Sequence, residues 1–460
     1  MSALWTSGEI AAAVGGAVHG DFEASGVAFD SREVEAGHLF VAMKGEATDG
    51  HRFLDKAFAA GAAGAIVSTE IDQPHVHVAD TAAALNALGR AARARTRARI
   101  CGVTGSAGKT GTKEALFAAL DRAAPGEAHR SVKSYNNHVG VPLSLARMPR
   151  ETRFGVFEMG MNHAGELAVL TRLVRPHVAI VTAIASAHRA FFASEEEIAD
   201  AKGEIFQGLE EDGIALVPHD SPYRGRLAAA ARPYAARVLS FGLGEGADIR
   251  ARDVVASPGG GSLVTAVLPE AELTFTVSQP GDHWVSNALA VLGAVEALGG
   301  DLALAGLALA DLPGLKGRGE RHRIRVGGGG EALLIDESYN ANPASMAATL
   351  KTFGGLAVTG RRIAVLGGMR ELGESSDDFH AGLAGPVEAA GVELAVLVGE
   401  EMEALAKALG AKVKMAHVPD TATAIELARR EARPGDAILV KGSNSIGLAA
   451  LVEALAGGKS

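Results

Sequence analysis

Short apolar runs alternate with longer helical patterns along most of the chain. The runs are rich in Val, Ile and Leu, and each has the length of one buried strand: 100–103, 155–158, 178–184, 214–217, 333–336, 363–366, 394–398 and 438–440. Buried strands that are separated by helices are typical of parallel sheets covered by helices. The pattern therefore predicts an α/β fold.

Changes in this pattern divide the chain into three predicted domains. A length of 460 residues is more than one hydrophobic core usually organises. Residues 1–82 form a small α/β pattern of their own, and the Pro- and Gly-rich segment 312–319 interrupts a helical pattern. We predict domains at 1–82, 83–313 and 314–460, the last a Rossmann-like unit in which four strands alternate with helices.

Composition and charge argue against a nucleic-acid-binding, disulfide-bonded or membrane-spanning protein. The 44 basic and 54 acidic residues give a net charge of −10, which offers no overall attraction for nucleic acid or anionic lipid. A single cysteine excludes an internal disulfide, and no apolar run is long enough for a membrane helix. We therefore expect a cytoplasmic enzyme with no nucleic-acid partner and no integral membrane contact. A monomer is our expectation for its oligomeric state, although no sequence feature determines it.

The strongest local motif is a glycine loop between a strand and a helix. The sequence Gly105-Ser106-Ala107-Gly108-Lys109-Thr110 follows the run 100–103 and precedes a helical pattern over 112–120. Such a loop turns backbone N–H groups toward phosphate oxygens, while Lys109 reaches the β- and γ-phosphates and Thr110 ligates Mg²⁺. The loop predicts a central P-loop ATPase domain, but by itself it leaves kinase, hydrolase and ligase open.

Candidate metal ligands follow two of the predicted strands. Glu158 ends one strand and His188 follows another, and ligands collect at the carboxyl ends of parallel strands. A carboxylate and an imidazole there could hold Mg²⁺, although His188 could equally be an ordinary loop residue. Lys202 is either a solvated surface lysine or a carbamylated one that supplies a further anionic ligand.

Several separate segments together resemble the ATP-dependent Mur ligases of peptidoglycan synthesis over essentially the whole chain. The most specific is Asp336-Glu337-Ser338-Tyr339-Asn340-Ala341-Asn342-Pro343, which is similar to the D-D-S-Y-N-A-N-P signature of the member that uses D-Ala-D-Ala. Other matching segments are 135–142, 158–161, 366–373 with His380, and 440–443. The resemblance implies a ligase of cell-wall biogenesis, and thus of cell shape and division.

The resemblance also implies roles for individual residues. ATP would contact Gly105, Ser106, Ala107, Gly108, Lys109, Thr110, Gly111, Asn287, Arg318 and Glu337. Mg²⁺ would be held by Thr110, Glu158, His188 and a carbamylated Lys202, and catalysis would use Lys109, Lys202 and His188. The substrates would contact Ser31, Arg32, Asn136, Asn137, Tyr339, Asn340 and Asn342, although Ser31 could belong to an ordinary turn.

The implied reaction joins D-Ala-D-Ala to UDP-MurNAc-tripeptide through an acyl phosphate. Five positions depart from the family pattern: Arg189 and Ala190 follow His188, Gly368 replaces an aspartate, Asn444 replaces an arginine, and Glu337 replaces the second aspartate of the signature. Loss of an arginine removes a planar fork for a carboxylate, so the dipeptide must be bound by another group or a different acceptor is used.

Other functions remain alternatives at this stage. Another Mur-type amino acid ligase or a folylpolyglutamate synthase-like ligase would share the ATP chemistry. A P-loop kinase or NTPase would account for the glycine loop but for nothing after residue 313, and a silent UDP-sugar-binding protein would not need Lys109, Glu158 and Lys202.

Overall fold

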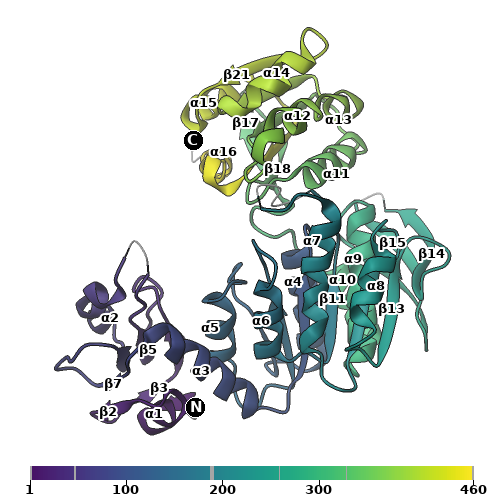
Figure 1. Ribbon diagram of the computed structural model, residues 1–460. Coiled ribbons are helices and arrows are strands. Elements are labelled where there is room, and N and C mark those ends of the chain that lie inside the picture. Colours follow the sequence, from purple (N-terminus) through teal and green to yellow (C-terminus); the bar gives the residue numbers. More distant parts are fainter. Residues whose placement is uncertain (1–2, 46–47, 187–190, 258–259, 328, 458–460) are drawn as a thin grey trace.

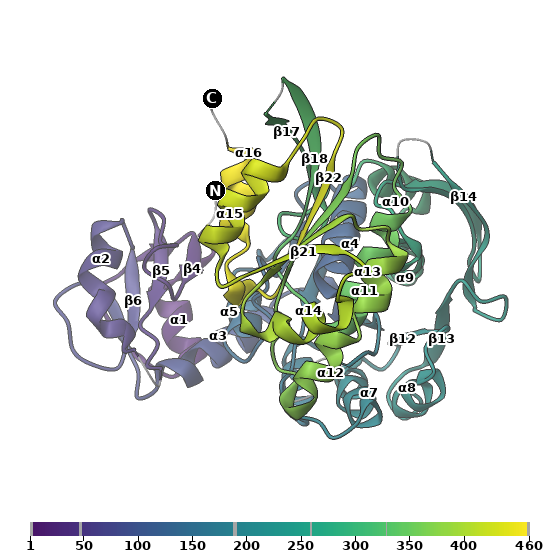
Figure 2. The ribbon, with the colours of Figure 1, turned by 90° about the horizontal axis from the view of Figure 1, so that it is seen from above.

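The computed structural model describes residues 3–45, 48–186, 191–257, 260–327 and 329–457. Within these residues the strands form three larger sheets, one after another along the chain, and Figure 1 shows them as three units. The purple first unit lies beside the central one, and the green and yellow third unit lies across the central unit's end (Figure 1; Figure 2 gives the view from above).

The first unit is built on a sheet of order β2-β7-β6-β5-β4, in which only the β2–β7 pair is antiparallel. Its strands are β2 (Ala17–His19), β4 (Gly26–Ala28), β5 (His38–Val41), β6 (Gly64–Val67) and β7 (His75–His77). The other elements of this part of the chain are β1 (Trp5–Thr6), β3 (Glu23–Ala24), α1 (Ser7–Val14), α2 (Leu54–Ala59) and α3 (Thr81–Ala94).

The central sheet has the order β16-β15-β14-β13-β12-β11-β8-β10-β9. Its strands are β8 (Arg99–Thr104), β9 (Ala128–Arg130), β10 (Phe154–Glu158), β11 (Val178–Val181), β12 (Ile214–Pro218), β13 (Arg237–Gly242), β14 (Ile249–Ala256), β15 (Ser262–Val267) and β16 (Glu272–Val277). The predicted strands β8, β10, β11 and β12 pair in parallel as expected, and so do β9, β13 and the start of β14, which the sequence pattern did not predict. Strands β14, β15 and β16 form an antiparallel extension, which the pattern did not predict either.

Helices cover both faces of the central sheet and enclose two hydrophobic cores. They are α4 (Lys109–Ala123), α5 (Gly140–Ala146), α6 (Glu166–Val174), α7 (Glu195–Gly203), α8 (Arg224–Ala231), α9 (Asp282–Ala297) and α10 (Leu302–Ala310). Successive residues of β8 point to opposite faces, so Ile100 packs in one core and Cys101, the chain's single cysteine, is fully buried in the other.

The third unit has the sheet order β17-β18-β22-β19-β20-β21. Its elements are β17 (Glu320–Val326), β18 (Gly330–Glu337), α11 (Pro343–Gly354), β19 (Arg362–Gly367), α12 (Ser376–Ala381), α13 (Ala384–Ala389), β20 (Leu394–Val398), α14 (Glu403–Leu409), β21 (Lys414–Val418), α15 (Thr421–Glu431), β22 (Ala437–Lys441) and α16 (Ala449–Ala456). The four predicted strands are present, but the prediction missed β17, which pairs antiparallel with β18, and β21.

Two predicted element boundaries were also wrong. The run 178–184 forms a strand only to Val181, because the chain then leaves the sheet beside the glycine loop, where the Ala183 carbonyl accepts the Ser106 N–H at 2.7 Å. The helix predicted over 112–120 begins three residues earlier, at Lys109, and ends at Ala123.

Candidate active site

The glycine loop joins β8 to α4 in a conformation that requires glycine at two positions. Gly105 has φ +149° and Gly108 has φ +83°, in the region that favours glycine. A Cβ on Gly105 would lie 2.0 Å from the Thr182 hydroxyl oxygen, and a Cβ on Gly108 would lie 3.1 Å from the Asn287 amide oxygen. The loop is therefore closely packed against neighbouring segments and ends at the N-terminus of α4.

Lys109 begins α4 with its charged group folded back over the glycine loop. Its Nζ donates a hydrogen bond to the Gly105 carbonyl oxygen at 2.7 Å. Burial lowers the pKa of Lys109, while the Glu158 carboxylate opposes that shift. A cation held on the inside of a phosphate-binding loop is well placed to neutralise phosphate oxygens.

Glu158 is the buried acid of the site. The side chain is 1% exposed at the end of β10, where Oε2 accepts a hydrogen bond from the Thr110 hydroxyl at 2.9 Å and Oε1 accepts one from the Asn136 amide at 2.8 Å. Lys113 Nζ lies 3.9 Å from Oε2. The Glu158 carboxylate and the Thr110 hydroxyl are hard oxygen donors of the kind that Mg²⁺ prefers, so these residues fit a magnesium site.

Lys202 is fully buried near the C-terminus of α7, so its interpretation as a solvated surface lysine was wrong. Its Nζ has no hydrogen-bond partner among the residues that the structure describes. Burial, with a smaller effect from the charge of Lys109, holds the pKa of Lys202 well below its usual range. A buried amine with a depressed pKa is more often neutral, which is the form that reacts with CO₂.

Two cavities meet at the glycine loop and bring most of the predicted site residues together. One, of about 280 Å³, is lined by residues 106–108, Gly111, Asn287, Arg318, Glu337, Asn340 and Asn342. The other, of about 380 Å³, is lined by residues 106–110, Asn136, Glu158, Arg318, Tyr339, Asn340 and Asn342. Both are walled by the central and third units, which are joined here by a hydrogen bond from the Asn342 amide to the Ser106 carbonyl oxygen at 3.3 Å.

The remaining predicted site residues that the structure describes, Gly105 and Lys202 among them, are not in the lining of either cavity. Asn137 lines neither cavity, and its side-chain oxygen instead accepts the Val139 and Gly140 N–H groups at the start of α5. Ser31 and Arg32 belong to the first unit and also line neither cavity. Arg32 is paired with Asp30 at 2.6 Å and its side chain is exposed. His188 lies outside the described residues.

Two cationic side chains in the cavity walls were not predicted. Lys441 ends β22, is 2% exposed, lines the smaller cavity and donates to Glu337 Oε2 at 3.3 Å. Arg370 lines the larger cavity, where it is paired with Glu401 and its Nε donates to Ser445 Oγ at 3.3 Å. The sequence signal for both was available, because each belongs to a segment that matches the family, although no role had been assigned to either.

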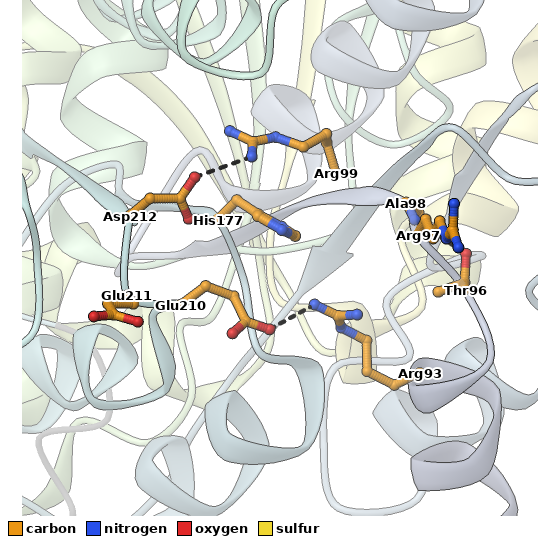
Figure 3. Close-up of a pocket in the computed structure, with 9 residues that line it drawn as sticks. All are labelled: Arg93, Thr96, Arg97, Ala98, Arg99, His177, Glu210, Glu211 and Asp212. Carbon is orange, nitrogen blue, oxygen red and sulfur yellow. Dashed lines mark hydrogen bonds and ion pairs between the residues drawn. The ribbon is translucent and has the colours of Figure 1, made fainter.

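A third cavity lies at the opposite end of the central strands (Figure 3). It has a volume of about 540 Å³, and its walls carry the ion pairs Arg93–Glu210 at 3.0 Å and Arg99–Asp212 at 3.2 Å. The charged side chains that line this cavity largely compensate one another. We therefore place the reaction at the glycine loop, at the carboxyl end of the sheet, where ligands of open α/β sheets bind.

The glycine loop, the buried acid, the buried lysine and the facing third unit define an ATP-dependent ligase with three domains, and the chain belongs to the Mur ligase family. Residues 23–101 match the Mur ligase family catalytic domain, residues 103–295 the Mur ligase middle domain, and residues 318–444 the Mur ligase glutamate ligase domain.

Individual relatives are similar to this chain in sequence and structure over almost its full length. The chain is 34% identical to the UDP-N-acetylmuramoyl-tripeptide–D-alanyl-D-alanine ligase of Escherichia coli (strain K12), covering 95% of this chain and 94% of that one. The crystal structure of MurF from Acinetobacter baumannii superposes with a TM-score of 0.85 at 30% identity, covering 99% of both chains. That of MurF from Thermotoga maritima in complex with ADP gives 0.78 at 26% identity, covering 94% of this chain and 97% of that one.

Among the helices of the described segments, none is both long enough and apolar enough to cross a membrane.

Proposed function

We infer that this chain joins D-Ala-D-Ala to UDP-MurNAc-tripeptide with hydrolysis of ATP. The observation that carries this inference is the agreement over nearly the whole length with ligases of that name, at about one-third identity. The site supports it, because a nucleotide loop faces a second wall that carries the octapeptide 336–343. As ATP and UDP-linked sugars are cytoplasmic metabolites, we place the reaction in the cytoplasm.

The chemistry begins with activation of a carboxylate, which is a poor electrophile. The terminal carboxylate of the tripeptide attacks the γ-phosphate of ATP, giving an acyl phosphate and ADP. Lys109, at the start of α4, balances the negative charge that develops on the transferred phosphoryl group. The amine of D-Ala-D-Ala then attacks the acyl carbon, the amide bond forms and phosphate leaves. Enclosure of the cavities by two units limits hydrolysis of the acyl phosphate by water.

We propose that Thr110, Glu158, His188 and a carbamylated Lys202 hold Mg²⁺ in this site. The Thr110–Glu158 contact and the unpartnered, buried Nζ of Lys202 support this ligand set within the described residues. A bound magnesium ion would neutralise phosphate charge. Carbamylation would convert Lys202 from a group that repels cations into an anionic oxygen ligand.

On the nucleotide side, we propose that Asn287, Arg318 and Glu337 contact ATP in the smaller cavity. Lys441 is held beside Glu337 in the same wall and adds a cation there. We further propose that residues 1–82, including Ser31 and Arg32, bind the UDP-sugar end of the substrate, while residues 83–313 bind ATP and residues 314–460 close over the cleft.

For the acceptor, we propose that Arg370 binds the carboxylate of D-Ala-D-Ala. Asn444 cannot provide a guanidinium, but Arg370 reaches the same cavity wall from the loop after β19. Glu401 and Ser445 orient its guanidinium. Glu401 also occupies space beside Gly368, where an added Cβ would lie 3.1 Å from its Oε2. Gly368 and Asn444, which replace an aspartate and an arginine of the family pattern, thus lie near an arginine at another position, Arg370, which can supply the cation.

A substrate panel tests the reaction. The purified chain with ATP and Mg²⁺ should extend UDP-MurNAc-tripeptide by D-Ala-D-Ala, as read by mass spectrometry, and should leave UDP-MurNAc-dipeptide unchanged. Lys109→Ala should lower kcat by about a hundredfold or more, because one contact to transition-state charge is lost. Addition of diaminopimelate or lysine to the dipeptide substrate would reject the proposal, as would normal ligation by a folded Lys109→Ala protein.

A further inference from the structure

A histidine-rich cluster at the edge of the first unit is separate from the active site. His19 at the end of β2 lies directly opposite His75 at the start of β7, and their rings stack in parallel with centroids 4.5 Å apart. Glu70, in the connection between β6 and β7, places its Oε2 3.5 Å from His75 Nε2 and 4.0 Å from His19 Nδ1. One potential ligand atom from each residue lies within 4.8 Å of the others.

The hydrogen bonds of His75 define which of its nitrogens is available. Its Nδ1 lies 2.8 Å from the Gln73 carbonyl oxygen, which can only accept, so Nδ1 carries the proton. Nε2 of the neutral ring therefore presents a lone pair. This atom has no hydrogen-bond partner in the described part of the chain, and the His75 side chain is only 1% exposed.

A buried lone pair that faces a carboxylate oxygen is unfavourable unless a positive charge lies between them. Here the nearest group to His75 Nε2 in the cluster is the acceptor-only Glu70 carboxylate. Either a second proton on His75 or a metal ion would satisfy both atoms. His19 Nδ1 lies 4.0 Å from the same Glu70 oxygen, and the half-exposed His19 ring can turn out of the stack so that this nitrogen ligates the metal ion as well.

We propose that His19, Glu70 and His75 bind a divalent transition-metal ion, with Zn²⁺ as the reference ion. Imidazole and carboxylate ligands bind Zn²⁺ at about 2.0–2.2 Å, which sets neighbouring ligand atoms about 3.3 Å apart in a tetrahedral site. The 3.5 Å separation is already close to this value, and the exposed side chains of His19 and Glu70 can shorten the 4.0 Å one. The Nδ1–H···O=C bond of His75 orients the ring as second-shell bonds do in zinc sites.

A second cluster of similar size is less suited to a metal ion than the cluster of His19, Glu70 and His75. Glu320, His322 and Asp336 also place potential ligand atoms together. The Asp336 carboxylate, however, already accepts the Gly317 N–H, the Ser338 N–H and the Ser338 hydroxyl. In the first-unit cluster the carboxylate of Glu70 is exposed and free to move toward a metal ion.

The bound ion would have a structural role, because none of its three ligands lines either active-site cavity. It would cross-link β2, a short edge strand with exposed side chains, to β7 and to the connection that carries Glu70. Binding to the folded state alone would raise the stability of the first unit by mass action.

The test is titration of the full, EDTA-treated chain with Zn²⁺, followed by calorimetry and by thermal unfolding. His19→Ala and Glu70→Gln are the main variants, since both change exposed side chains and should fold. His77→Ala is the matched control, because His77 lies two residues from His75 on the same strand and outside the cluster. Comparing variants separates this site from any Zn²⁺ that enters the active site.

We expect wild type and His77→Ala to bind one more equivalent of Zn²⁺ than His19→Ala, or to bind that equivalent about a hundredfold more tightly, since even second-shell changes cost ten- to a hundredfold. Zn²⁺ should raise the Tm of wild type and His77→Ala more than that of His19→Ala. With Co²⁺ in place of Zn²⁺, wild type should show visible absorption that Glu70→Gln reduces. Equal stoichiometry, affinity and Tm response in wild type and His19→Ala would overturn the proposal.

Discussion

At the residue scale, Lys202 stands out because its amine is fully buried and has no hydrogen-bond partner among the described residues. A buried ammonium beside the cation Lys109 is unfavourable, and carbamylation removes that conflict. We predict that Lys202→Ala loses most activity, by about a hundredfold on the scale of one lost transition-state charge contact. Acetate should occupy part of the vacated space and restore some of the rate, as measured by phosphate release.

Lys109→Ala is the control for this rescue, because acetate cannot replace a cation. Acetate should therefore leave the Lys109→Ala rate unchanged. Equal activity of Lys202→Ala and wild type, or equal acetate effects on the two variants, would assign Lys202 a purely structural role.

Arg370 carries the second prediction at this scale. Arg370→Ala should raise the KM for D-Ala-D-Ala about tenfold or more while leaving the KM for ATP nearly unchanged, because a hydrogen-bonded pair with a charged group contributes about 1.5–3 kcal/mol. Arg370→Lys should recover the charge but only part of the affinity, since the planar fork is lost. Steady-state kinetics with each substrate varied in turn measures both effects.

A second substitution, Asn444→Arg in the Arg370→Ala protein, tests whether a guanidinium at position 444 can replace that of Arg370. This change returns a guanidinium to the same cavity wall, next to Ser445, which Arg370 contacts. Recovery of the D-Ala-D-Ala KM would support the assignment of a relocated cation, whereas an Arg370→Ala protein with an unchanged KM would exclude it.

The site could be predicted from the sequence where its residues belong to compact motifs. Lys109 and Thr110 follow from a local strand, loop and helix, and Glu158 from its place at the end of a strand. The interaction of Arg370 with Glu401 joins the loop after β19 to the short 3-10 helix after β20, and only the folded sheet brings these segments together. Burial of Lys202 was equally hidden, because an acidic first turn in α7 gives the helix the appearance of a surface element.

At the element scale, the sequence predicted strands that are buried on both faces and missed those that are partly solvated. β8, β10 and β11 are almost wholly buried and appear as continuous apolar runs. β14 instead carries Arg250, Arg252 and Asp253, and most of its residues are exposed or half-buried. Its antiparallel pairing with β15 is set by contacts between strands, which composition alone does not reveal.

The edge strand β9 gives a prediction about pH. His129 donates Nε2–H to the Ser144 carbonyl oxygen of α5 at 2.8 Å, and burial lowers the pKa of His129 to about 4. Between pH 6.5 and 4 the unfolded chain takes up a proton that the folded chain does not. Stability should therefore fall as the pH decreases through this window, by at most about 1.4 kcal/mol per pH unit from this one group.

His129→Gln isolates that contribution, because glutamine keeps a hydrogen-bond donor but does not titrate. Urea unfolding at several pH values between 7 and 4 should give a smaller loss of stability in His129→Gln than in wild type. Parallel pH profiles of the two proteins would show that His129 does not contribute to acid sensitivity.

At the scale of the whole molecule, Glu33 joins the first unit to the central one. Its carboxylate accepts hydrogen bonds from Lys133, from the Tyr135 hydroxyl at 2.5 Å and from Arg147 at 3.5 Å. We predict that Glu33→Gln lowers stability by about 1–3 kcal/mol, because polar groups at a half-buried junction lose their charged partner. Calorimetry should show an earlier transition of the first unit.

Glu35→Gln is the appropriate comparison, since Glu35 is a nearby exposed acid whose ion pair, with His38 at 3.8 Å, lies within the first unit. It should leave the unfolding profile close to wild type. If Glu33→Gln and Glu35→Gln unfold alike, the junction is held by other contacts, such as the hydrogen bond from Trp5 Nε1 to the Ala146 carbonyl oxygen at 2.8 Å.

The burial of Cys101 within β8 has a practical consequence for observing how the units move. Burial raises the pKa of the Cys101 thiol, and thiolates are the form that maleimide dyes attack. The natural chain should thus remain unlabelled when native. A cysteine introduced for exposed Val169 on α6 and another for exposed Arg323 on β17 would be the two reactive positions. Fluorescence energy transfer between them, with and without substrates, would test the proposed closure of the third unit without any native thiol having to be removed.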